Sequence, residues 1–98
     1  MLNTAEKRYE KELVKHVKKL GGKCLKFNTC TEAGNPDRLV LLPGGFSCWV
    51  ELKSDGKYLD PLQSVRFREL FALGQNVWSV NREDQLSILK GYLQKQVK

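Results

Sequence analysis

The chain has 98 residues and a mass of 11.2 kDa, which suits one compact domain and excludes a doubly wound dinucleotide-binding enzyme, an eight-stranded α/β barrel or a repeat array. Hydrophobic residues make up 41% and charged residues 29%, so one core can form without disulfides, and a disordered chain is disfavoured. Seventeen Lys and Arg against eleven Asp and Glu give a net charge of +6, which favours a polyanionic partner such as nucleic acid.

The sequence shows neither a membrane segment nor a secretory signal. Its uncharged runs fall far short of the roughly twenty apolar residues that cross a bilayer, and residues 1–19 lack the apolar stretch and cleavage site of a signal peptide. Cys24, Cys30 and Cys48 form no Cys-x-x-Cys pair and fit a reducing compartment better than a disulfide framework. Their spacing with His16 matches no common zinc site. We therefore expect a cytoplasmic protein without a membrane partner.

The first predicted element is an amphipathic helix from about Thr4 to Leu20, which Gly21-Gly22 ends. The helical spacing separates an apolar side from a basic side, with Tyr9, Leu13, Val17 and Leu20 on the first and Lys7, Lys11, Lys15, Lys18 and Lys19 over much of the second. Glu10 lies a full turn before Val14 and points toward the apolar side, where a carboxylate is costly unless something compensates it.

Three short extended segments follow, at Lys23 to Asn28, Arg38 to Leu42 and Ser47 to Lys53. Residues 29–36, between the first two segments, are predicted to form a loop that Asn35-Pro36 ends. The turn residues Pro43-Gly44-Gly45 predict a hairpin between the last two segments.

A second helix is predicted over Pro61 to Leu73, with Asp60 as its N-cap and a core stripe that includes Val65, Leu70 and Leu73. Asn76 to Val80 predicts a fourth strand, and Glu83 to Leu93 predicts a last helix. The hairpin implies antiparallel pairing, and the helix between strands three and four implies a parallel crossover. The sequence therefore predicts one domain over residues 1–98, an α/β sandwich whose mixed four-stranded sheet is flanked by helices in the order α-β-β-β-α-β-α.

Charged residues at the ends of two neighbouring predicted strands form the candidate site. Asp37 opens the second strand, and Glu51 and Lys53 share one face of the third because side chains alternate along a strand. Two carboxylates at neighbouring strand ends suit Mg²⁺, which takes one or two protein carboxylates and keeps several waters. Lys53 could stabilise the charge that develops on a phosphoryl group, or help orient and deprotonate the attacking water. Glu10 could hold a metal-bound water, and Gln63 could orient water or a phosphate.

Four pieces of the sequence occur in a specific order, namely Glu10, Gly34-Asn35-Pro36-Asp37, Glu51-Leu52-Lys53 and Gln63. This order resembles the VRR-NUC family of the PD-(D/E)XK nuclease superfamily, whose pattern is a helix glutamate, Gly-x-Pro-Asp, a Glu-x-Lys strand and a downstream glutamine. Pro-Asp with Glu-x-Lys alone is a weak pattern, whereas the ordered set along nearly the entire chain is much more specific. The helix glutamate stays open because Glu6, Glu10 and Glu12 lie close together, and its place on the apolar side favours Glu10.

The resemblance implies a restriction-endonuclease-like core and metal-dependent hydrolysis of DNA phosphodiesters that leaves 5′-phosphate and 3′-hydroxyl ends. It implies Asp37 and Glu51 as metal ligands together with the backbone carbonyl of Leu52, and Lys53 as the catalytic cation. The implied cofactor is Mg²⁺, with Mn²⁺ able to substitute. A phage or mobile-element protein that acts in DNA replication and repair in a bacterial host also fits the resemblance.

Cationic side chains are the candidates for contact with the phosphate backbone of DNA, namely Lys7, Lys11, Arg38, Arg66 and Arg68. Each candidate residue has a plainer interpretation: the lysines could form a solvated helix face, and Arg38 could pair with a carboxylate. Glu51 and Lys53 could protect an edge strand, and Asp37 could merely close a turn. The joint occurrence of the site residues favours the catalytic interpretation, because the plainer one needs an unrelated explanation for each residue.

One small domain presents one metal site, so coordinated cutting of a four-way (Holliday) junction requires a symmetric dimer. Stand-alone VRR-NUC members resemble junction resolvases, and the chain has no evident reader of base sequence. We therefore expect a homodimer that recognises branched DNA by its shape, with apolar residues of the fourth strand or last helix, including Trp78, as candidate dimer contacts. The alternatives are a flap or nicking nuclease and a non-catalytic DNA-binding module.

Overall fold

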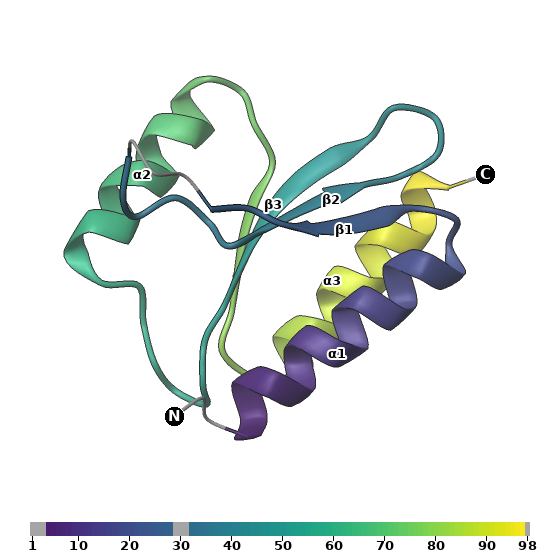
Figure 1. The fold of residues 1–98 in the computed structure, drawn as a ribbon, viewed down its shortest axis with the longest axis horizontal. Coiled ribbons are helices and arrows are strands. Elements are labelled where there is room, and N and C mark those ends of the chain that lie inside the picture. The colour runs from purple at the N-terminus through teal and green to yellow at the C-terminus, as the bar shows by residue number, and fades with distance from the viewer. Residues whose placement is uncertain (1–3, 29–31, 98) are drawn as a thin grey trace.

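The computed structural model describes residues 4–28 and 32–97, and its helices and strands follow the predicted order (Figure 1). The elements are α1 (Thr4–Lys19), β1 (Lys23–Lys26), β2 (Arg38–Leu41), β3 (Ser47–Leu52), α2 (Pro61–Ala72), β4 (Val77–Val80) and α3 (Glu83–Gln96). Part of the predicted loop at 29–36, including Cys30, lies outside the described residues.

The strands form one mixed sheet in the order β1-β2-β3-β4. β1 pairs with β2 and β2 with β3 in antiparallel fashion, whereas β3 and β4 run parallel and are connected through α2. The predicted hairpin, the predicted crossover and the mixed four-stranded sheet are therefore confirmed. Glu51 lies opposite Ser79 in the parallel pair. The carboxyl ends of the two parallel strands consequently meet at one edge of the sheet, where open α/β sheets form their ligand crevices.

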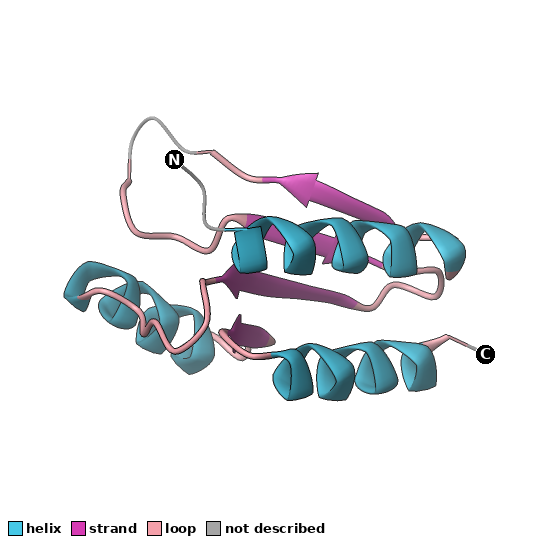
Figure 2. Ribbon diagram, turned by 90° about the horizontal axis from the view of Figure 1, so that it is seen from below, coloured by secondary structure: helices cyan, strands magenta, loops and turns pink. Residues whose placement is uncertain are grey.

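The core lies between one face of the sheet and the pair α1 and α3, which pack against each other in front of that face (Figure 2). The helices contribute Tyr9, Leu13, Val17, Leu86, Leu89 and Leu93, and the sheet and its hairpin contribute Val40, Leu42, Cys48, Val50, Leu52 and Val80. Because side chains alternate along a strand, Trp49 and Glu51 point to the opposite face of β3. Burial of each large aliphatic side chain contributes roughly 1.5–3 kcal/mol to folding.

The packing of α2 corrects one prediction. No residue of α2 is buried, and Leu73, predicted to be in its core stripe, is the C-cap residue and is 74% exposed. Val65 and Leu70 are only half-buried, so the predicted stripe is wrong. α2 lies beyond one end of the α1 and α3 layer and contacts β4, so it has no full layer against which to bury a stripe (Figure 2).

Some element boundaries also differ from the prediction. α3 continues past Leu93 to Gln96, and Val97, which follows the helix, packs against the core. Tyr92, in the last turns of α3, packs against Phe46 and Trp78, with ring centroids 5.7 Å and 5.1 Å away. β1 ends at Lys26, where its pairing with β2 reaches Arg38, the first residue of β2. No helix in the described ranges is long and apolar enough to span a bilayer.

Candidate active site

Glu51 is the centre of the candidate site. It is the penultimate residue of β3 and is only 7% exposed. Its Oε1 accepts a hydrogen bond from the backbone N–H of Asp37 (3.1 Å), and its Oε2 accepts one from Gln63 Nε2 (3.3 Å). The ammonium nitrogen of Lys53 lies 3.9 Å from the same Oε2. The predicted residues Asp37, Lys53 and Gln63 therefore converge on Glu51.

Burial raises the pKa of Glu51 to about 7 from an ordinary value of 4.5. The Lys53 ammonium opposes this rise in pKa, whereas the negative charges of Asp37 and Glu6 add to it. A buried carboxyl group that shares its surroundings with other carboxylates is stabilised in its ionised form by a nearby divalent cation. The electrostatics of Glu51 therefore fit a metal-binding carboxylate.

The segment before β2 brings Asp37 to the site. The backbone N–H of Phe27 donates to the Asp37 carbonyl (2.7 Å), which continues the pairing of β1 with β2. Gly34 allows this segment to approach α2: its φ is +90°, and a Cβ atom there would lie 2.7 Å from Leu62 Cγ. The glycine of the predicted Gly-x-Pro-Asp pattern is thus explained by close packing against α2.

Gln63 is oriented by the capping box at the start of α2. Asp60 Oδ1 accepts a hydrogen bond from the backbone N–H of Gln63 (2.9 Å), and Gln63 Oε1 accepts one from the backbone N–H of Asp60 (3.0 Å). Because the cap holds Oε1, the amide group Nε2 is turned toward Glu51. The predicted N-cap role of Asp60 is confirmed, and the same cap directs Gln63 into the site.

The three candidate helix glutamates have different surroundings. Glu10 forms an ion pair with Arg38 (2.9 Å), whose side chain is 13% exposed and also donates to the Cys24 carbonyl (3.4 Å). Glu12 pairs with Lys90 (3.0 Å). The negative charge of Glu6 makes the smallest of the contributions that raise the pKa of Glu51. The compensation expected for Glu10 on the apolar side is therefore present as Arg38, and Glu6 makes a small contribution to the electrostatic environment of Glu51.

The predicted DNA-contacting cations fall into two groups. The first group is exposed and consists of Lys7, Lys11 and Arg68. The second group has protein partners: Arg38 pairs with Glu10, and Arg66 lies 2.9 Å from Glu32 and 3.1 Å from Glu69. Arg66 also donates to the Ala33 carbonyl (2.9 Å), so it ties the segment before β2 to α2. The first group is better placed to reach a phosphate backbone.

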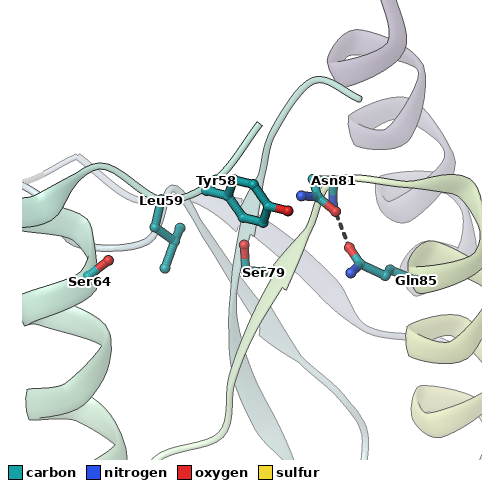
Figure 3. A pocket seen from close by; sticks show the side chains of 6 residues that line it. All are labelled: Tyr58, Leu59, Ser64, Ser79, Asn81 and Gln85. Atoms are coloured by element: carbon teal, nitrogen blue, oxygen red, sulfur yellow. Dashed lines mark hydrogen bonds between the residues drawn. The ribbon is translucent and has the colours of Figure 1, made fainter. Parts of the chain in front are cut away.

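A cleft that no sequence motif indicated opens beside the site (Figure 3). Its volume is about 350 Å³, and it is lined by Tyr58, Leu59, Ser64, Ser79, Asn81 and Gln85. Ser79 is the register partner of Glu51, so the cleft lies next to the carboxylates. The predicted parallel crossover could have located it, because such a crossover brings the carboxyl ends of two strands to one crevice.

The carboxylates at this site fit the ligand preference of Mg²⁺. Across residues 4–28 and 32–97, no group of three or more His, Cys, Asp or Glu side chains could hold a metal ion. Mg²⁺ requires only one or two protein carboxylates, because waters and phosphate oxygens complete its shell. Glu51 is one candidate, and Asp37, whose negative charge raises the pKa of Glu51, is the second. Cys48 is fully buried in the hydrophobic core, and this burial raises the pKa of its thiol to about 12.

Two known proteins are similar to this chain over most of its length, although no family model matches it. The first, "Putative nuclease p44" of Acyrthosiphon pisum secondary endosymbiont phage 1, is 44% identical over 80 residues, which cover 82% of this chain and 86% of the phage protein. The second is a solved structure described as "VRR_NUC domain", with a TM-score of 0.80 and 30% identity, covering 89% of this chain and 95% of that one. Both similarities therefore extend over most of the fold.

Proposed function

This chain belongs to the VRR-NUC family, and from that premise we propose that it is a metal-dependent, structure-specific DNA endonuclease that resolves four-way junctions as a homodimer. The family and the name of the phage relative support nuclease activity. The observation that carries the proposal is the convergence of Asp37, Lys53 and Gln63 on the buried Glu51. A module that only binds DNA gains nothing from carboxylates that repel phosphates.

The proposed metal ligands are the Asp37 and Glu51 carboxylates and the backbone carbonyl of Leu52. When bound, Mg²⁺ or Mn²⁺ would polarise the scissile phosphodiester and lower the pKa of a coordinated water. Lys53, held beside Glu51, would stabilise the negative charge that develops on the phosphoryl oxygens. Gln63 would keep the Glu51 carboxylate in position through its hydrogen bond from Nε2.

The helix carboxylate that we assign to this site is Glu6. Its support is electrostatic, because the negative charge of Glu6 contributes to the raised pKa of Glu51. Glu10, which the sequence favoured, forms an ion pair with Arg38, with 2.9 Å between its carboxylate oxygen and a guanidinium nitrogen. In this assignment Glu6 would hold a water near the carboxylates, and Glu10 would neutralise a largely buried arginine.

A row of apolar side chains that the described part of the chain covers only partly supports the homodimer. Leu25, Leu39, Trp49 and Val77 lie opposite one another across the sheet, on the face away from α1 and α3. Leu25 is 44% exposed, and the other three are half-buried. Trp78, predicted as a dimer contact, instead packs against Tyr92 and the core. A second copy seated on this row would bury it and bring two acidic sites into one particle.

The test is a cleavage assay on labelled four-way junction, flap, nicked and linear duplex DNA, with Mg²⁺, with Mn²⁺ and with chelator. The compared proteins are wild type, Glu51→Gln and the control Asp84→Asn, which removes an exposed carboxylate on α3. We expect paired symmetric cuts in the junction by wild type and Asp84→Asn, and none with chelator or with Glu51→Gln.

Other outcomes of this assay separate the alternatives. Metal-dependent cutting of only flaps or nicks would keep the nuclease and contradict junction resolution. Absence of cutting on every DNA by folded protein with metal would contradict the enzyme and leave a DNA-binding module.

A further inference from the structure

The cleft beside Glu51 has a composition that the proposed chemistry does not use. None of its six lining residues is an Asp, Glu, Lys, Arg or His. Phosphate groups and metal ions are bound through charged partners or helix ends, so this composition does not favour either. Its hydroxyl and carboxamide groups, together with the ring of Tyr58, suit a neutral, planar and polar ligand. Its volume of about 350 Å³ lies at the small end of ligand pockets.

Asn81 gives the cleft an unused hydrogen-bond acceptor. This residue is 9% exposed, and its Nδ2 donates to the Lys57 carbonyl (2.8 Å), which fixes the orientation of the amide. Its backbone N–H donates to Gln85 Oε1 (2.7 Å; Figure 3). Its Oδ1 is buried and has no hydrogen-bond partner within the described part of the chain. Because an unpaired buried acceptor is costly, a ligand that brings an N–H donor gains binding energy here.

Tyr58 provides an exposed aromatic surface at the same place. It is 85% exposed, and Figure 3 shows its ring beside Ser79 with the hydroxyl directed toward Asn81. A tyrosine this exposed contributes little to the core, and aromatic rings on nucleic-acid-binding proteins stack on unpaired bases.

We propose that this cleft binds one unpaired nucleobase of the DNA substrate, stacked on Tyr58 and hydrogen-bonded through its Watson–Crick edge to Asn81 and the serine hydroxyls. The inference rests on the proposed nuclease function. Ser79 is the register partner of Glu51, and neighbouring strands lie about 4.8 Å apart. The bound base therefore belongs to a nucleotide at or next to the cleaved bond.

This cleft would give the nuclease a preference for branch points. Removing a base from its stack costs least where the base is unpaired or mismatched, so continuous duplex is disfavoured. Every nucleobase carries an N–H donor on its Watson–Crick edge, so the cleft would accept all four bases. The selection is thus for DNA structure and not for sequence.

The test combines abasic DNA with removal of the Tyr58 ring. A single abasic residue is scanned through the nucleotides around the branch of a flap and of a four-way junction. Kd is measured by fluorescence anisotropy in Ca²⁺, which has the same oxygen-ligand chemistry as Mg²⁺. For wild type, one abasic position should weaken binding about tenfold. Tyr58→Ala should bind intact DNA about tenfold more weakly and lose no further affinity at that position.

Two control variants and a salt titration distinguish stacking from a general loss of binding. Tyr58→Phe keeps the ring and should behave as wild type, and Phe71→Ala, which removes a 74% exposed ring near the other end of α2, should keep the full abasic effect. The slope of log Kd against log salt should be the same in wild type and Tyr58→Ala, because no phosphate contact is lost.

An abasic effect that is absent at every position, or equal in wild type and Tyr58→Ala, overturns the inference. The cleavage assay with Mg²⁺ is run on the same DNAs. Cutting by wild type without a Tyr58-dependent abasic effect overturns the base cleft alone, whereas failure of wild type to cut any DNA overturns the proposed function and this inference with it.

Discussion

Two partly buried carboxylates of this protein are compensated in different ways. Glu10 meets Arg38 at 2.9 Å, and that pair satisfies its charge. Glu51 is more deeply buried, and its nearest cation is Lys53 at 3.9 Å. Its pKa is accordingly raised to about 7, so a free-energy cost of holding the ionised form remains in the folded protein. Such a cost at one residue is typical of functional sites and not of structural ion pairs.

The raised pKa of Glu51 predicts a stability that depends on pH. The folded protein binds the Glu51 proton more tightly than the unfolded chain does, so stability should fall as pH rises from about 4.5 to about 7 and stay low above that range. Glu51→Gln removes the free-energy cost of ionising Glu51. It should therefore raise the free energy of unfolding at pH 8 by about 2–3 kcal/mol more than at pH 5. Urea unfolding at both pH values measures the difference, with Asp84→Asn as the control. An equal change at pH 5 and pH 8 would contradict the burial effect.

The surroundings of the helix glutamates predict opposite phenotypes for two neighbouring substitutions. Glu6→Gln should change the free energy of unfolding by less than about 0.5 kcal/mol and lower the cleavage rate about 10–100-fold. Glu10→Gln leaves Arg38, whose side chain is 13% exposed, without its carboxylate, and should cost about 2 kcal/mol of stability. Its cleavage rate per folded molecule should stay near that of wild type. The reverse pattern would return the catalytic role to Glu10.

At the scale of elements, polar contacts tie α2 to β3 and to the segment before β2. α2 buries no residue in the core, but Gln63 donates to Glu51, and Arg66 contacts Glu32 and the Ala33 carbonyl. The same segment continues into Asp37, and the same helix carries Gln63. The packing of this segment on α2 therefore sets the positions of two site residues together.

Gly34 offers a test of that packing. Gly34→Ala places a Cβ atom 2.7 Å from Leu62 Cγ at a φ of +90°, and should cost about 2–3 kcal/mol of stability and lower the cleavage rate. Gly44→Ala is a matched control, because its φ is +91° and no atom lies within 4 Å of the new Cβ. It should cost about 1 kcal/mol with little change in cleavage. Thermal unfolding and cleavage assays on both variants compare them, and equal effects would show that the close approach is unimportant.

At the scale of the whole molecule, α1 and α3 cover one face of the sheet, and among the helices of residues 4–28 and 32–97 only α2 lies at one end of the other face (Figure 2). The row formed by Leu25, Leu39, Trp49 and Val77 is consequently left without a full second layer. Interfaces between identical subunits are enriched in such apolar surface.

The apolar row predicts how the dimer can be broken. Light scattering should give wild type a mass of twice the 11.2 kDa chain, and Leu25→Lys should give that of one chain. Ile88→Lys, at a 61% exposed site on α3, should leave the dimer intact. Leu25→Lys should also convert paired junction cuts into single nicks, because each subunit keeps its own carboxylates. A monomeric wild type, or a Leu25→Lys variant that stays dimeric, would contradict this interface.

The sequence by itself predicted the order of elements and the mixed sheet, because these depend on local periodicity, turn residues and spacing along the chain. The resemblance to the VRR-NUC pattern brought Asp37, Glu51, Lys53 and Gln63 together as one candidate site. The α2 stripe was wrong because periodicity shows which residues share a helix face and not whether another layer covers that face.

Only the tertiary structure decided which residues meet across the fold. Glu6, Glu10 and Glu12 lie within two turns of α1 and cannot be separated by spacing, whereas Arg38 on β2 and Lys90 on α3 select their partners in space. The raised pKa of Glu51 and the cleft between α2, β4 and α3 arise in the same way. Burial of a side chain and its contacts depend on residues that are far apart in the chain. A local sequence pattern therefore does not predict them.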